Sequence, residues 1–140
     1  MAAGTSPFHA CCDCQCSVLR RASRAVTQHY EASFRGTGLR ATQFTVLATL
    51  AQTGPLPLTE LAGMLGLERT SLTRNLRPLE KKGLVGAHAD EDQRVRRIAI
   101  TGKGERTARA ALSAWNRAQS TVGEVLRRTG IDKLFGPGRR

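Results

Sequence analysis

Apolar residues recur every three to four positions over two long stretches near the ends of the chain. This spacing predicts amphipathic helices over residues 17–35 and 101–128. An apolar run over residues 44–50, ending at a turn over residues 53–55, predicts a further helix. Amphipathic helices that flank a small core need a partner for their apolar stripes, so we expect a homodimer that buries them. The alternative is that both helices pack only on the core of their own chain. The residues expected at its interface are Val18, Leu19, Val26, Leu112, Trp115 and Val122.

Two shorter helices are predicted between these long ones. Leucines share one face over residues 58–65 and again over residues 69–82, and Gly66 ends the first of these helices. Two short helices joined by a tight, glycine-containing turn form a helix-turn-helix unit. Because Pro78 removes a backbone donor inside the second helix, we expect that helix to kink or to tilt its two halves.

The residues that follow change to the alternating pattern of strands. Ile98 and Ile100 share a face, and the polar run over residues 90–94 supplies the turn of a β-hairpin, which forms a wing behind the helix-turn-helix. The pattern therefore predicts a mainly α fold with a small β-hairpin wing, in which a winged helix-turn-helix is flanked by N- and C-terminal dimerisation helices. The expected parts are a disordered lead over residues 1–10, an N-terminal helix over 11–38, the winged helix-turn-helix over 39–104, and a C-terminal dimerisation helix and tail over 105–140.

The chain has a strong excess of positive charge, which indicates a negatively charged binding partner. The chain carries 22 lysines and arginines against 11 aspartates and glutamates, a formal net charge of +11. Such a balance favours binding to nucleic acid over binding to an anionic membrane surface. No stretch approaches the about 20 apolar residues of a membrane span, and the N-terminus lacks the basic start and apolar stretch of a signal peptide. We therefore expect a cytoplasmic protein with no membrane partner.

The helix over residues 69–82 and the hairpin carry the side chains expected to contact double-stranded DNA. Arg74 is long enough to reach a guanine edge in the major groove, and Asn75 can pair with adenine. Arg94 can enter a narrow minor groove while Asp92 holds its guanidinium group. Neighbouring arginines on the outgoing strand alternate faces, so we expect one of them to meet phosphate. The candidate DNA-binding residues are Arg69, Thr70, Ser71, Thr73, Arg74, Asn75, Arg77, Asp92, Arg94, Arg96 and Arg97.

Six short segments occur in a characteristic order between Leu39 and Gly104. They are Gln43-Phe44-Thr45-Val46-Leu47, Thr59-Glu60-Leu61-Ala62, Thr70-Ser71-Leu72-Thr73-Arg74, Leu79-Glu80-Lys81-Lys82-Gly83-Leu84-Val85, Asp92-Gln93-Arg94 and Ile100-Thr101-Gly102-Lys103-Gly104. In this order and spacing they resemble the winged helix-turn-helix of the multiple-antibiotic-resistance regulator (MarR) family. The chain departs from the family pattern at Pro78 and over residues 86–89, where members often carry charged residues.

The resemblance implies a homodimer that places one recognition helix in each major groove and a wing arginine in the minor groove. It also implies repression of the protein's own gene or of a neighbouring operon. Carried over by position, the recognition residues are Thr70, Ser71, Thr73 and Arg74, and the wing pair is Asp92 with Arg94.

All cysteines of the chain fall in one short cluster, Cys11, Cys12, Cys14 and Cys16. They lie too close together for disulfide bonds among them to cross-link distant parts of the fold, so any role is local. Soft sulfur ligands can hold zinc or copper(I), although separations of zero or one residue differ from those of ordinary zinc knuckles. Alternatively, the nearby arginines at positions 20, 21 and 24 favour a thiolate that senses oxidants, as some members of the resembled family do. A cluster with no role is the third reading, and no cofactor other than such a metal is implied.

Catalytic constellations are not recognisable in the sequence. There is no glycine-rich phosphate loop, and the neighbouring acids over residues 90–92 lie on an exposed hairpin turn. We therefore expect a sequence-specific DNA-binding transcriptional regulator, a repressor that responds to an oxidant or a small-molecule effector, and not an enzyme. One alternative is a winged-helix protein-interaction module or metal-responsive adaptor whose basic surface is incidental, and another is a small thiol enzyme built on the cysteine cluster.

Overall fold

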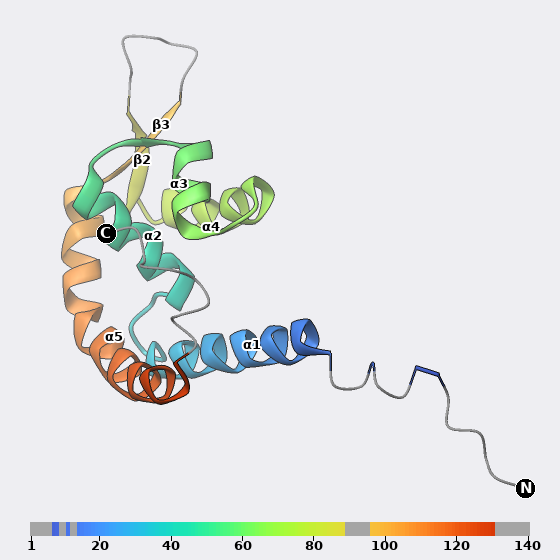
Figure 1. The fold of residues 1–140 in the computed structure, drawn as a ribbon. Helices are drawn as coiled ribbons and strands as arrows, with labels where there is room; N and C mark the ends of the chain where they lie inside the picture. Colours follow the sequence, from blue (N-terminus) through green and yellow to red (C-terminus); the bar gives the residue numbers. More distant parts are fainter. Residues whose placement is uncertain (1–6, 9–10, 12–13, 89–95, 131–140) are drawn as a thin grey trace, which may run out of the picture.

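The computed structural model describes residues 7–8, 11, 14–88 and 96–130 and confirms a mainly α fold with a small sheet (Figure 1). The expected lead over residues 1–10 and the C-terminal tail lie largely outside these residues. No helix in the described ranges is long and apolar enough to span a bilayer. In chain order the elements are α1 (Gln15–Ser33), α2 (Ala41–Thr53), β1 (Leu56–Pro57), α3 (Leu58–Leu65), α4 (Arg69–Lys81), β2 (Val85–His88), β3 (Arg97–Ile100) and α5 (Gly102–Thr129).

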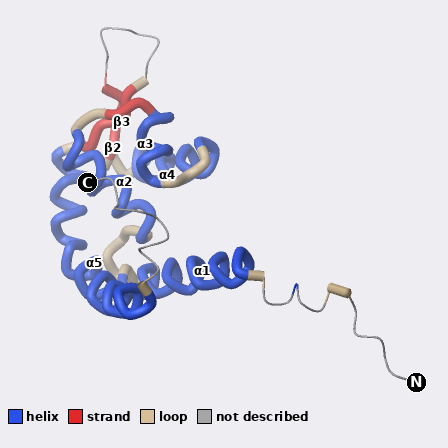
Figure 2. Tube along the Cα trace, viewed as in Figure 1, coloured by secondary structure: helices blue, strands red, loops and turns tan. Residues whose placement is uncertain are grey.

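Helices α2, α3 and α4 form a lobe with the sheet, and the long helix α5 leads from this lobe to α1 (Figures 1 and 2). The core of the lobe is built from the apolar faces that the periodicity predicted, with Leu47, Leu61, Leu72 and Leu79 completely buried. Helix α1 contributes no buried residue of its own. The helix-turn-helix is thus a packed unit, whereas α1 lies against it at one end.

The sheet contains a strand that the sequence pattern did not predict. Strand β1 is two residues long and pairs antiparallel with β3, Leu56 opposite Ile98, which makes the order β1-β3-β2. So short a strand has no room for an alternating pattern, and it includes a proline. Pro57 is tolerated because β1 lies at an edge of the sheet, where a missing backbone donor leaves no interior ladder bond unmade.

Helix α4 runs without interruption through Pro78. Its last turn closes normally, since the Lys82 N–H donates to the Pro78 carbonyl at 3.1 Å and the Leu84 N–H donates to the Leu79 carbonyl at 2.9 Å. Gly83 then adopts a φ of 69°, which allows the chain to turn directly into β2. The proline therefore does not end α4.

The first turn of α5 is locked onto the lobe. The Thr101 hydroxyl accepts a hydrogen bond from the Gly104 N–H at 3.0 Å and donates one to the Gly83 carbonyl at 2.7 Å. Gly104 packs so closely on β2 that a Cβ there would lie 2.0 Å from the Leu84 carbonyl oxygen. Further along, the small side chains of Ala108, Ala111, Ala114 and Ala118 keep α5 close to its neighbours.

Replacing Gly104 with alanine should therefore destabilise the fold. The methyl group would collide with backbone, and such overpacking costs about 1–3 kcal/mol. Gly123→Ala is the matched control on the same helix, because its Cβ would meet only the flexible end of Arg127 at 3.3 Å. The control should be neutral or gain up to about 1 kcal/mol from helix propensity. Urea unfolding followed by circular dichroism measures both, and equal stabilities of the two variants would contradict the close approach.

Candidate nucleic-acid interface

Helix α4 presents one basic face to solvent. Leu72, Leu76 and Leu79 are buried, and the opposite side is formed by exposed residues at helical spacing. These exposed residues are Thr70, Arg74, Arg77 and Lys81. No acid of α4 shares this side, so it is a continuous positive surface of the kind that fits a major groove.

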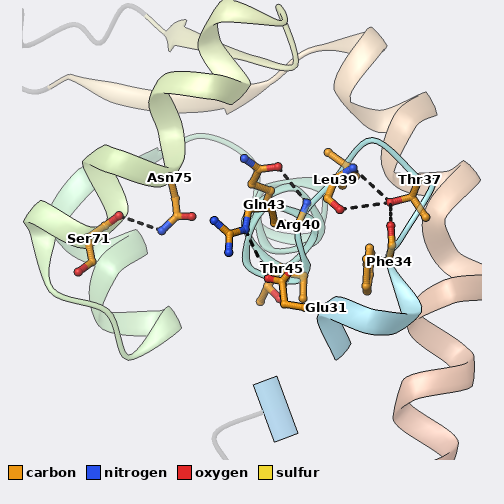
Figure 3. Close-up of polar contacts among 10 residues, drawn as sticks. Glu31, Phe34, Thr37, Leu39, Arg40, Gln43, Thr45, Ser71 and Asn75 are labelled. Carbon is orange, nitrogen blue, oxygen red and sulfur yellow. Dashed lines mark hydrogen bonds and ion pairs between the residues drawn. The ribbon is translucent and has the colours of Figure 1, made fainter. Parts of the chain in front are cut away.

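Two predicted recognition residues, Ser71 and Asn75, lie on a flank of α4 that faces α2 (Figure 3). Both are half-buried. The Asn75 amide donates to the Ser71 carbonyl at 2.9 Å, so one of its donors is already used inside the helix. Arg74, one residue earlier, is exposed. Asn75 is therefore placed less well for base contact than Arg74.

A polar cluster at the start of α2 lies beside this flank of α4 (Figure 3). Gln43 is 5 % exposed, and its Oε1 accepts a hydrogen bond from the Arg40 backbone N–H at 3.0 Å. The Arg40 side chain forms an ion pair with Glu31 of α1 at 3.7 Å. The cluster fixes the start of α2 and ties it to α1. Its signal in sequence is weak, because Glu31 and Arg40 belong to different elements.

The two arginines at the start of β3 have different surroundings. Arg96 is exposed and forms an ion pair with Glu80 of α4, with 2.7 Å between its Nη2 and the Glu80 Oε1. Arg97 is half-buried, and its Nη1 donates to the Pro55 carbonyl at 3.4 Å. Of the pair, Arg96 is thus the one available to phosphate. Asp92 and Arg94 lie outside the described residues, so their wing role stays a prediction.

A hollow of about 540 Å³ separates α4 from the sheet. Arg69, Arg77 and Glu80 line it from α4, Thr59 from α3, and Arg96 from the residue just before β3. Thr73 lies on the same side of α4, and its hydroxyl donates to the Arg69 carbonyl at 2.8 Å. Glu80 is a functional candidate that no pattern in the sequence indicates. Its partner is 16 positions away, and nothing in the spacing indicates that they meet.

The residues predicted for a dimer interface divide into two groups. Val18 and Leu19 on α1 are each 37 % exposed, and Leu112 on α5 is 44 % exposed. Val26, Trp115 and Val122 are half-buried, and Trp115 stacks on Phe44 of α2 with 6.4 Å between ring centroids. Trp115 therefore belongs partly to the core of its own chain.

The cysteine cluster lies at the start of α1. Cys11, Cys14 and Cys16 are free and exposed, while Cys12 lies outside the described residues. The Arg20 Nη2 lies 3.8 Å from the Cys16 Sγ. Within the described ranges, no group of three or more His, Cys, Asp or Glu side chains is arranged to hold a metal ion.

A second hollow, of about 300 Å³, lies where α1 and α5 meet the helix-turn-helix. Its lining combines apolar side chains with hydroxyl groups and contains no charged residue. The residues are Val26, Thr27, Tyr30, Ala41, Thr42, Thr45, Leu65, Leu67 and Trp115. The Tyr30 hydroxyl donates to Gln119 Oε1 of α5, and burial raises the pKa of Tyr30 above its ordinary value of 10.0.

Sequence comparison relates this arrangement to known regulators. The MarR family profile matches residues 39–95. The HTH-type transcriptional regulator MhqR of Bacillus subtilis is 35 % identical over 88 residues, which are 62 % of this chain and 61 % of that protein. Two curated relatives from this bacterium are thus matched over less than two thirds of their lengths, 61 % and 64 %.

Solved structures of transcriptional regulators extend the likeness over most of the chain. The M. tuberculosis regulator MosR has a TM-score of 0.75 and 34 % identity, covering 91 % of this chain and 94 % of that one. MosR in complex with DNA gives a TM-score of 0.70 and 36 % identity, covering 86 % and 92 %. Overoxidized AbfR bound to DNA gives a TM-score of 0.67 and 27 % identity, covering 86 % and 92 %.

The single tyrosine of the chain allows a direct test of the α1–α5 contact. Absorbance at 295 nm should show a titration midpoint above 10 in the native protein, and a lower one in urea. Because the folded-state pKa is the higher, the stabilisation is complete below pH 10 and is lost as the pH rises through the folded pKa. Tyr30→Phe should lower stability at pH 7 by about 0.5–1.5 kcal/mol and flatten its fall above pH 10. Identical midpoints in water and urea would refute the burial.

Proposed function

The chain belongs to the MarR family of DNA-binding transcriptional regulators, and we propose that it is a cytoplasmic homodimeric repressor of a short pseudo-palindromic operator. The observation that carries this proposal is the acid-free exposed face of α4, which holds Thr70, Arg74 and Arg77 on the side of the arginines at the start of β3. Arg74 is placed to read a guanine edge in the major groove, and Thr70 is short enough for close approach to bases.

The dimer is supported by the apolar surface that α1 and α5 leave exposed. Val18, Leu19 and Leu112 share this property with Val125 and Leu126, which are 57 % and 37 % exposed. Large exposed apolar side chains on two packed helices favour burial against an identical surface. A two-fold dimer through these helices would present two α4 helices to successive major grooves, about 34–36 Å apart.

The uncharged hollow beside Tyr30 supports a small-molecule effector. Its apolar walls and hydroxyl groups suit a small, uncharged aromatic ligand better than an ion. Leu65 and Leu67, which line it, flank the turn that leads into α4. A ligand there would press on the turn that sets the direction of the recognition helix.

Arg74→Ala tests the DNA-binding assignment on an operator isolated by selection from random duplexes. Loss of a bidentate base contact should weaken binding by about 1–3 kcal/mol and relax the preference at one base pair in each half-site. Asn75→Ala should have a smaller effect, because that side chain lies on the α2 flank. Arg128→Ala is the matched control, since it removes an exposed arginine at the far end of α5.

Fluorescence anisotropy and sequencing of the selected sites give affinity and base preference, and native mass spectrometry should find two chains per duplex. Unchanged affinity and preference in Arg74→Ala would refute the recognition role. Duplex binding that does not weaken with rising salt would favour the protein-interaction module, because phosphate contacts release counterions.

We further propose that the cysteine cluster makes the repressor responsive to peroxides. The observation is a set of exposed thiols directly ahead of Val18 and Leu19, with Arg20 next to Cys16. A thiolate attacks the peroxide oxygen, which releases water and leaves a sulfenic acid; a second thiol then displaces hydroxide as water and forms a disulfide. Two thiols and one hydrogen peroxide thus give one disulfide and two waters. One solved neighbour of this chain, AbfR, is overoxidized in its complex with DNA.

Peroxide treatment of anaerobically purified protein should therefore lower its mass by about two hydrogens through the disulfide chemistry above and change operator affinity. The variant with serine at positions 11, 12, 14 and 16 should show neither effect while binding the operator as the reduced protein does. Metal analysis of the same sample tests the alternative that the cysteine cluster binds a metal ion. Stoichiometric zinc or copper would identify the cluster as a metal site. A peroxide response retained by the serine variant would exclude the cluster as the sensor.

A further inference from the structure

Glu80 points into the hollow between the recognition helix and the sheet, and there it meets Arg96. Their closest atoms are 2.7 Å apart, with the Arg96 side chain 66 % exposed and that of Glu80 33 % exposed. Arg69 and Arg77 line the same hollow from α4. It therefore holds more positive than negative charge, and its carboxylate is engaged by one of the arginines.

This hollow is continuous with the base-reading side of α4. A neighbouring depression of about 590 Å³ shares Arg69, Thr73 and Arg77 with it and extends to Thr70 and Arg74. Two adjoining basic depressions thus lie along α4, one at its exposed face and one toward the start of β3. When a recognition helix enters the major groove and a wing lies over the adjoining minor groove, the sugar-phosphate strand between the grooves passes between these two elements.

We propose that the hollow binds a backbone phosphodiester of that strand, and that Glu80 is a positioning residue that directs Arg96 toward it. The inference rests on the proposed DNA-binding function and assigns a partner to one part of its surface. It also gives a role to Glu80, a carboxylate that would by its charge alone repel DNA phosphate.

Removal of the Glu80 carboxylate can either raise or lower the affinity for DNA, and the direction of this change distinguishes a positioning role from a purely electrostatic one. A carboxylate near DNA repels phosphate, so by charge alone its removal should tighten binding. A free arginine side chain, however, loses considerable rotamer freedom when it binds. The ion pair holds one nitrogen of the Arg96 guanidinium and leaves its other donors for a phosphate oxygen. If Glu80 acts by positioning, its removal therefore weakens binding.

The experiment uses the full chain and a fluorescein-labelled 40-base-pair duplex of random sequence, because a phosphate contact does not depend on sequence. Affinities are measured from low to high salt for Glu80→Gln, Glu80→Ala, Arg96→Gln and the double variant Glu80→Gln with Arg96→Gln. Glu105→Gln is the matched control, because it breaks the Glu105–Arg109 ion pair of the same 2.7 Å length on α5. Thermal unfolding checks that every variant folds, and exposed ion pairs of this kind contribute little to stability.

We expect Arg96→Gln to weaken binding about 3- to 10-fold at low salt and to lower the salt slope by about one. Glu80→Gln and Glu80→Ala should shift affinity and slope in the same direction, whereas Glu105→Gln should not. The double variant should bind no more weakly than Arg96→Gln. Tighter binding or a steeper slope in both Glu80 variants would overturn the positioning role.

Two further outcomes separate the inference from the function on which it rests. If the wild-type chain does not bind the duplex, both the proposed function and the phosphate site fail. If it binds but Arg96→Gln does not alter the slope, the phosphate site alone fails. Inorganic phosphate, added at ionic strength matched with chloride, should compete no better than chloride. Competition that Arg96→Gln abolishes would identify a free-anion site and overturn the backbone assignment.

Discussion

The close approach of the first turn of α5 to β2 is the constraint on which the arrangement of this molecule depends. Gly104 lies against the Leu84 carbonyl, where no side chain fits, and Thr101 bonds both to Gly104 and to Gly83. Lys103 adds a bond from its Nζ to the Lys82 carbonyl at 2.8 Å. The end of the recognition helix, the first wing strand and the start of α5 are thus held at one point. The direction of α5 relative to α4 follows from that junction.

This junction also reaches the segment that follows α1. The Lys82 Nζ donates to the Gly38 carbonyl at 2.8 Å, so the residue after α4 connects to the loop between α1 and α2. Both helices proposed to form the dimer are therefore tied to the same end of the recognition helix. A change in how α1 and α5 pack, by a ligand beside Tyr30 or by oxidation near Val18, has a direct mechanical path to α4. Such coupling requires packed elements with two arrangements, and the junction supplies the contact between them.

Sequence patterns predicted the elements well because the packing of this fold is periodic. Leu61 of α3 and Leu72, Leu76 and Leu79 of α4 are buried where their spacing placed them. The strand β1 was missed because two residues carry no period. Helix α4 continues through Pro78, and the kink or tilt expected there stays a prediction. Side-chain roles were harder to predict. Asn75 can pair with adenine only if the rotation of the helix allows it, and the structure turns Asn75 toward α2. The contact of Glu80 with Arg96 depends on the tertiary fold. Periodicity determines which residues face inward, while the polar contacts of a surface depend on elements distant in sequence.

The distribution of charge on this small basic protein bears on how it can select one DNA sequence over another. A net charge of +11 attracts any duplex from a distance, but this attraction is screened beyond about 10 Å at ordinary salt and carries no sequence information. Selectivity must come from side chains whose positions are fixed before DNA arrives, because a mobile arginine contacts any phosphate or base within its reach. Acidic residues hold two arginines in place in this chain. Glu80 engages Arg96, whose proposed phosphate contact fixes the position of the protein on the duplex without reading its sequence, and Glu31 engages Arg40 at the start of α2. The acids thus cost some attraction and give in return a defined geometry for the positive charges that remain.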